Sequence, residues 1–168
     1  PERVETLILN ETSPAFDGVL DLPPIGEELA DFFAKAATTT VPDPDDHEAL
    51  VSMLVEDQRA FVPEGFDEAR MRAVIERVVR RTPDMRPSFA NHQAMSDGEP
   101  VEATLADIAA PTLVIHGTRD PLFPIGHGEI LARDIPDATL LVLDGVGHEP
   151  PPPSTWDKVV PAIIDHTS

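Results

Sequence analysis

Cysteine is absent from the 168 residues of this chain. Without thiols there are no disulfides, no zinc sites built on cysteine and no cysteine nucleophiles, and the redox compartment cannot be inferred. Long apolar runs are missing too, because no segment approaches the ~18 consecutive apolar residues of a membrane-spanning helix. The sequence therefore predicts a soluble protein with no membrane partner.

Basic residues are scarce in this chain. Lys and Arg number 12 against 31 Asp and Glu, which gives a formal net charge of −19 at pH 7. A field of this sign repels phosphate backbones and anionic headgroups, so no nucleic acid partner is expected. Such acidity is mainly a statement about solubility and is typical of the solvated surface of a cytosolic or halotolerant protein. We expect a cytoplasmic location.

Three short apolar runs give the best strand signals in a chain long enough for one ordinary domain. They cover Arg3 to Asn10, Thr112 to Gly117 and Thr139 to Gly145. Between the last two runs, residues 126–136 are rich in helix formers and close on a proline, which predicts a strand, helix, strand unit. After the third run we expect a final helix, capped by Ser154 and kinked at Pro161.

The middle of the chain differs in kind from its ends. Residues 27–36, 45–61 and 67–81 have helical patterns, with apolar residues at the spacings of one helix face in the third. Eight prolines between residues 14 and 87 break the links, which predicts short helices joined by mobile turns. We therefore assign residues 1–12 and 103–168 to one α/β core, and residues 13–102 to a helical insertion.

Two polar residues follow the ends of the second and third predicted strands. Asp120 lies in "IHGTRDPLFP" and His148 in "DGVGHEPP". If the strands are parallel neighbours, both side chains emerge at one edge of the sheet, where the carboxylate can orient the imidazole as a general base. Taken singly, each residue has a plainer interpretation. An aspartate before a proline is often a turn residue, and a histidine between glycine and glutamate is often a surface residue.

The pairing of these two turns resembles a known family. "APTLVIHGTRDPLFP" followed by "IPDATLLVLDGVGHEPPP" resembles the C-terminal third of an α/β-hydrolase, and "PERVETLILNETSP" resembles the strand after the nucleophile helix. The resemblance implies a partial α/β-hydrolase fold, with the last three parallel strands, flanking helices and an inserted helical cap. Within the superfamily, the chain looks most like bacterial esterases of the aclacinomycin methylesterase type.

The resemblance also implies roles for individual residues. Asp120 would be the acid and His148 the general base of a Ser-His-Asp triad that hydrolyses a small-molecule ester. The nucleophilic serine of a G-x-S-x-G turn, and the oxyanion hole beside it, would lie upstream of Pro1. Ser96 in "AMSDG" has the right chain order, but no strand leads into it and Pro100 follows where a helix should begin. The chain alone is therefore expected to be inactive, as the C-terminal fragment of an enzyme.

Other readings stay open at this point. Haloalkane dehalogenases, epoxide hydrolases and C–C bond hydrolases share the fold, the acid and the histidine, and differ mainly at the nucleophile. A non-catalytic fragment that binds a ligand through the helical insertion is a further alternative. No cofactor and no metal site are expected. His116 is predicted to be structural, and the four remaining histidines have no metal-ligand spacing: His47, His92, His127 and His166.

Two surfaces of the predicted fold could have a role in binding. Several large apolar side chains of the helical insertion could line an acyl pocket or form the insertion's own small core: Phe32, Phe33, Met53, Phe61, Phe89 and Met95. The strand at residues 3–10 would lack one neighbour and form an exposed edge. Such edges pair with other strands, so we expect a homodimer or pairing with the missing half.

Overall fold

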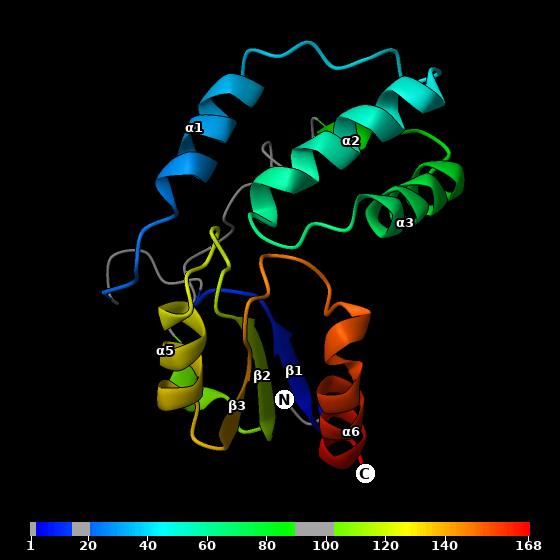
Figure 1. Ribbon diagram of the computed structural model, residues 1–168. Coiled ribbons are helices and arrows are strands. Elements are labelled where there is room, and N and C mark those ends of the chain that lie inside the picture. Colours follow the sequence, from blue (N-terminus) through cyan, green and yellow to red (C-terminus); the bar gives the residue numbers. More distant parts are fainter. Residues whose placement is uncertain (1–2, 15–20, 90–102) are drawn as a thin grey trace.

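The computed structural model describes residues 3–14, 21–89 and 103–168 (Figure 1). Within these ranges, strands alternate with helices in the way expected of an α/β protein. The elements are β1 (Leu7–Asn10), α1 (Glu27–Ala36), α2 (His47–Phe61), α3 (Glu68–Arg81), β2 (Thr112–Gly117), α5 (Gly126–Asp134), β3 (Ala138–Leu143) and α6 (Trp156–His166), with short 3-10 turns η1 (Leu105–Asp107) and η2 (Pro153–Thr155).

The three strands form one parallel sheet in the order β1-β2-β3. All six residues of the central strand β2 are buried, which explains its continuous apolar run. The expected neighbouring parallel strands are thus confirmed, with two changes at their ends. Strand β1 begins at Leu7 and not at Arg3. Strand β3 ends at Leu143, and Gly145 adopts a φ of 76° in the turn that follows.

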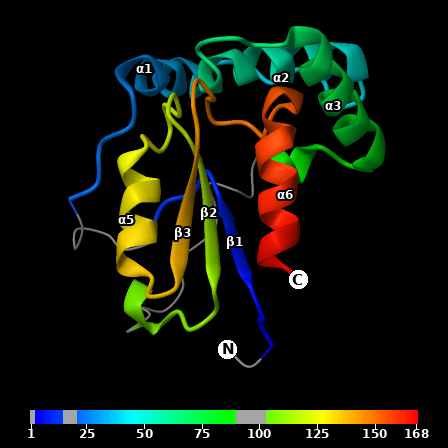
Figure 2. The same ribbon diagram turned by 60° about the horizontal axis from the view of Figure 1, so that its bottom comes forward.

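Helices α5 and α6 cover opposite faces of the sheet (Figure 2). Successive strand residues point to opposite faces, so β2 contributes to two cores. On one face Val114 packs with residues of α5, and on the other Leu113 and Ile115 pack with Val159 of α6. The sheet is therefore packed on both faces, and the loops of the site leave from the ends of its strands.

The final helix begins later than the sequence predicted. Ser154 lies inside the 3-10 turn η2, and helix α6 starts at Trp156 with no side-chain cap at its N-terminus. The prediction of a Ser154 cap is therefore wrong. The Thr155 hydroxyl instead donates to the carbonyl oxygen of Pro152 at 2.8 Å, and Pro152 is the last residue with an extended backbone before this turn. The helix continues through Pro161.

Helices α1, α2 and α3 form a layer over the carboxyl ends of the strands, which we call the helical segment, residues 27–81 (Figure 1). Helices α2 and α3 begin at Asp46 and Asp67, whose carboxylates accept backbone N–H groups as N-caps. They share a core that includes Leu50 and Ile75, so the prediction of loosely joined helices is wrong for this pair. The boundaries of a separate insertion at 13 and 102 stay a prediction.

The helices of the described ranges are short. None of those within the described ranges is both long and apolar enough to cross a bilayer. The longest, α2, has 15 residues and carries charged side chains along its length.

Candidate active site

The structure brings Asp120 and His148 together at the carboxyl edge of the sheet. Asp120 follows β2 and His148 follows β3, and the imidazole Nδ1 lies 2.8 Å from the carboxylate Oδ2. The Asp120 side chain is fully buried, whereas that of His148 is 26% exposed. The juxtaposition expected from two neighbouring parallel strands is therefore present. Gly117 permits it, since a Cβ there would collide with the carbonyl oxygen of Val146 in the loop that leads to His148.

The carboxylate of Asp120 is fixed on both of its oxygens. Oδ1 accepts the backbone N–H groups of Leu122 and Phe123, each at 2.8 Å, in a turn that Pro121 helps to form. Oδ2 is left to accept the proton of His148 Nδ1. Three hydrogen bonds therefore converge on one buried carboxylate. As the acceptor at Oδ2, Asp120 selects the tautomer of His148 that carries its proton on Nδ1 and its lone pair on Nε2.

His148 is also held from the helical segment. Its backbone N–H donates to the carbonyl oxygen of Phe61 at 2.8 Å. Its ring is flanked by those of Phe123 and Phe61, with centroids 5.6 and 6.0 Å away. The imidazole therefore has a fixed direction and an apolar surround on two sides, as a general base requires.

Glu11 is a third residue of this site, and it was not among the residues that the sequence patterns indicated. It follows β1 directly and is 5% exposed. One of its carboxylate oxygens lies within 4.8 Å of a carboxylate oxygen of Asp120 and of a ring nitrogen of His148. Burial, and then the nearby charge of Asp120, raise the pKa of Glu11 to about 8. Its backbone φ of 45° is unusual for a residue other than glycine. The polar "NETSP" directly after an apolar strand was the signal that could have found it.

A metal ion could be held only by this same group of three residues within the described part of the chain. Glu11 and Asp120 offer carboxylate oxygens and His148 offers a nitrogen, a mixed set that suits zinc or iron. The nitrogen that faces Asp120 is already joined to it through a proton. A metal there would have to displace that proton, and the expectation of no metal site stays a prediction.

Two other histidines, His116 and His127, hold loops in place. His116 is fully buried, its Nε2 lies 2.7 Å from the carbonyl oxygen of Phe123, and burial lowers its pKa. This contact agrees with the structural role predicted for it. His127 is bonded to the Ser13 hydroxyl and to the carbonyl oxygen of Pro23, each at 2.8 Å. Three residues considered earlier lie outside the described ranges: Ser96, His92 and Met95.

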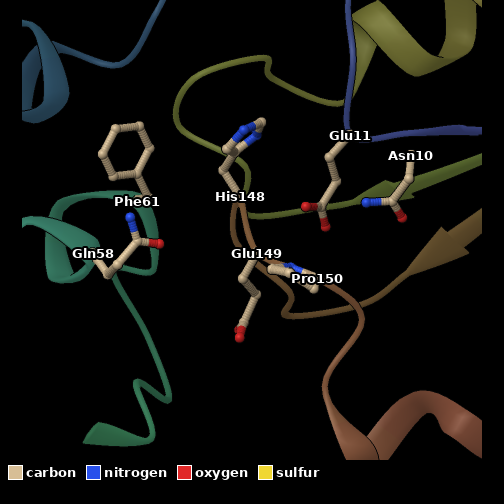
Figure 3. Close-up of a pocket in the computed structure, with 7 residues that line it drawn as sticks. All are labelled: Asn10, Glu11, Gln58, Phe61, His148, Glu149 and Pro150. Carbon is tan, nitrogen blue, oxygen red and sulfur yellow. The ribbon is translucent and has the colours of Figure 1, made fainter. Parts of the chain in front are cut away.

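A pocket of about 440 Å³ lies beside His148 on the β1 side of the sheet. Figure 3 shows Phe61 and Glu11 on opposite sides of His148 at this pocket. Phe61 also contacts Phe32 and Phe33 in a cluster of aromatic rings. Of the large apolar side chains that could line a pocket, Phe61 lines this one. By contrast, two other residues of that set pack against the core of α2 and α3: Met53 and Phe89.

Comparisons with known proteins agree with this architecture. The family described as the alpha/beta hydrolase fold matches residues 1–152. A pimeloyl-(acyl-carrier protein) methyl ester esterase from Aromatoleum aromaticum is 30% identical over 158 residues, which cover 89% of this chain and 59% of the esterase. The chain therefore spans little more than half the length of this curated relative.

Two solved structures show the same fold. A 2-hydroxy-6-oxo-6-phenylhexa-2,4-dienoate hydrolase from Rhodococcus sp. strain RHA1 matches with a TM-score of 0.57 and 24% identity, over 99% of this chain and 56% of its own. The esterase RhEst1 from Rhodococcus sp. ECU1013 matches with a TM-score of 0.55 and 18% identity, over 86% of this chain and 50% of its own. The finer resemblance to aclacinomycin methylesterases stays a prediction. The family match and the parallel sheet together establish that this chain belongs to the α/β-hydrolase family.

Proposed function

We propose that this chain carries the acid and the base of a Ser-His-Asp triad, and that the complete cytoplasmic enzyme hydrolyses small-molecule carboxylic esters. The observation that carries the proposal is the 2.8 Å hydrogen bond from His148 Nδ1 to the buried carboxylate of Asp120. It leaves Nε2 as the basic nitrogen, next to a pocket that a substrate and a nucleophile could share.

In this proposal the reaction proceeds in two halves. The serine oxygen attacks the ester carbonyl while His148 Nε2 takes its proton, and Asp120 stabilises the imidazolium that forms. His148 then returns the proton to the departing alcohol, which leaves an acyl-enzyme. Water repeats the sequence, with His148 first accepting its proton and then returning it to the serine.

The choice of an ester is supported by the name of the relative that is 30% identical, a methyl ester esterase. The same acid and base would serve a C–C bond hydrolase, a haloalkane dehalogenase or an epoxide hydrolase, because those reactions differ mainly at the nucleophile. A serine nucleophile favours the ester or C–C reaction, while an aspartate nucleophile indicates a dehalogenase or an epoxide hydrolase.

We also propose that the chain alone has no hydrolase activity. In the α/β-hydrolase family the nucleophile precedes the acid and the histidine in chain order, so a serine and the amide donors of its oxyanion hole would have to come from an additional segment. Ser96, the candidate rejected on its sequence context, has no apolar run before it that could form the strand of a nucleophile turn.

The test uses a fluorophosphonate probe, which labels activated serines, together with hydrolysis of p-nitrophenyl acetate. The 168-residue chain should give neither labelling nor turnover, and the protein that retains the upstream coding sequence should give both. In the longer protein, Asp120→Asn and His148→Gln should abolish both signals, whereas His47→Gln on the exposed start of α2 should preserve them. Labelling of the short chain that is lost in Ser96→Ala would contradict the proposal.

A further inference from the structure

The loop that carries His148 is held residue by residue by the helical segment. Gly147 lies against the end of α2, where an added Cβ would sit 2.6 Å from the carbonyl oxygen of Phe61. The N–H of His148 donates to that same oxygen. Arg70 of α3 then holds the next two residues, Glu149 and Pro150. We propose that Arg70 is a positioning residue for His148, which fixes the imidazole against Asp120 from the helical segment.

Arg70 makes two bonds to this loop. Its Nη1 donates to the Glu149 carboxylate at 2.7 Å, and its Nη2 donates to the carbonyl oxygen of Pro150 at 3.0 Å. The side chains of the ion pair are only 21% and 10% exposed. An ion pair shielded to this degree is weakened little by salt, and a guanidinium can hold two acceptors in a fixed geometry that an ammonium cannot reproduce.

The other ion pairs of the helical segment are of a different kind. Arg59 binds Glu56 and Glu68 through side chains that are all more than 40% exposed, and these pairs stay within the segment. Exposed pairs contribute little to stability. The Arg70 pair spans 79 residues of sequence and joins the segment to the loop after β3. One other described pair joins the segment to the core, Glu64–Arg119 at 3.5 Å, but both of its side chains are more than half exposed. The Arg70 pair is the shielded one, and it acts on the loop that carries His148.

Loss of Arg70 would leave Glu149 without its counter-charge in an acidic neighbourhood. Glu11 and Asp120 face the same region, and the charge of Glu149 contributes to the raised pKa of Glu11. An unpaired and largely buried carboxylate is costly, so the loop would move to hydrate Glu149. His148 is the adjacent residue, and the movement would lengthen its hydrogen bond to Asp120. That His148 is the general base rests on the function proposed above, whereas its position can be measured without any activity.

The first test uses the 168-residue chain and NMR spectroscopy. Two signals report on the loop: the exchange rate of the His148 backbone N–H, and the downfield proton of its Nδ1. Arg70→Met should accelerate exchange of the His148 amide by about tenfold or more and weaken the Nδ1 signal, since it removes a charge-assisted hydrogen bond. Arg70→Lys should give an intermediate result. Arg77→Met, an exposed arginine on the same helix, should change neither signal.

The amide of Ile115 in the centre of β2 separates a local effect from unfolding, because its exchange should stay unchanged in every variant. If Arg70→Met also accelerates exchange at Ile115, Arg70→Lys provides the decision, since it keeps a positive charge beside Glu149 but cannot hold both acceptors in a fixed geometry. Unchanged His148 signals in a folded Arg70→Met, or in Arg70→Lys where Arg70→Met unfolds the sheet, would overturn the inference.

The second test uses the longer protein that retains the upstream sequence. Arg70→Met should lower kcat with little change in KM, and Arg70→Lys should recover part of the loss, because the substrate contacts are kept while the base is misplaced. If the wild-type longer protein has no ester activity but the NMR signals respond, the proposed function fails and the positioning role stands. If the wild type is active and the NMR signals do not respond, the positioning role fails alone.

Discussion

The sheet and the helical segment bury their side chains in different ways. Strand β2 is buried along its whole length, whereas helix α3 buries one face only, through Met71, Ile75 and Val79. The loops at the edge of the sheet supply Asp120 and His148, which we call the dyad. The helical segment supplies a carbonyl oxygen and an arginine that hold one of those loops. The difference indicates that the Asp120–His148 pair is built on the sheet, while its geometry depends on both regions.

The largest expected effect is the loss of kcat when a side chain held by the sheet is changed. In the longer protein, Asp120→Asn should lower kcat for ester hydrolysis by roughly 10⁴-fold, because an amide no longer selects the productive tautomer of His148. Phe33→Ala on the exposed face of α1 should change kcat/KM less than about tenfold. Steady-state kinetics with p-nitrophenyl esters would measure both. A comparable loss in the two variants would show that the division between the regions is wrong.

The next effect concerns the two cores. Ile115→Ala in the sheet and Leu50→Ala in the helical segment should each cost about 2–5 kcal/mol of unfolding free energy, because both leave a cavity at a fully buried site. The two variants should differ in which part of the protein is weakened. Ile115→Ala should weaken the Asp120–His148 hydrogen bond, while Leu50→Ala should raise amide exchange mainly in α2 and α3. Urea unfolding with hydrogen exchange would measure this. Loss of sheet protection in Leu50→Ala would contradict separate cores.

Glu11 should make the sheet less stable as the pH rises. Its pKa is raised from 4.5 in the unfolded chain to about 8 in the folded one. Between these values the folded state binds more protons, so the stability contribution of this residue falls with pH and levels off above about 8. Glu11→Gln should therefore unfold like the wild type near pH 4.5 and be more stable at pH 8, by on the order of 3 kcal/mol.

Urea unfolding at a series of pH values measures this difference. Glu5→Gln serves as the control, since it removes an exposed carboxyl near the same strand. A constant difference between Glu11→Gln and wild type from pH 4.5 to 8 would mean that Glu11 titrates normally in the folded chain.

The smallest effect concerns the edge of the sheet. Strand β1 pairs only with β2 among the described strands, and Ile8 on it is 36% exposed. We propose that this edge pairs with a second copy of the chain or with the missing half. Ile8→Lys should then shift a dimer at micromolar concentration toward monomer, whereas Val142→Lys on β3 should shift it less. Sedimentation velocity measures this, and a wild-type chain that is already monomeric would count against a homodimer.

Sequence patterns predicted the sheet and the dyad because both depend on local rules. Three apolar runs defined the strands, and residues just past neighbouring parallel strands must meet at one edge. The burial of Glu11 could not be predicted, because it depends on how the loop at Glu149 packs over the end of β1. The contact between Arg70 and Glu149, which lie 79 residues apart in sequence, could not be predicted either, since it follows from the docking of α3 on that loop.

Nitrogen NMR of the His148 imidazole tests the central claim most directly. In the 168-residue chain at pH 8, Nδ1 should carry the proton and Nε2 the lone pair, with the Nδ1 proton strongly downfield because it is bonded to Asp120. In Asp120→Asn that downfield signal should disappear. A His148 that carries its proton on Nε2, and whose spectrum is the same in wild type and Asp120→Asn, would show that these two residues do not form the proposed pair.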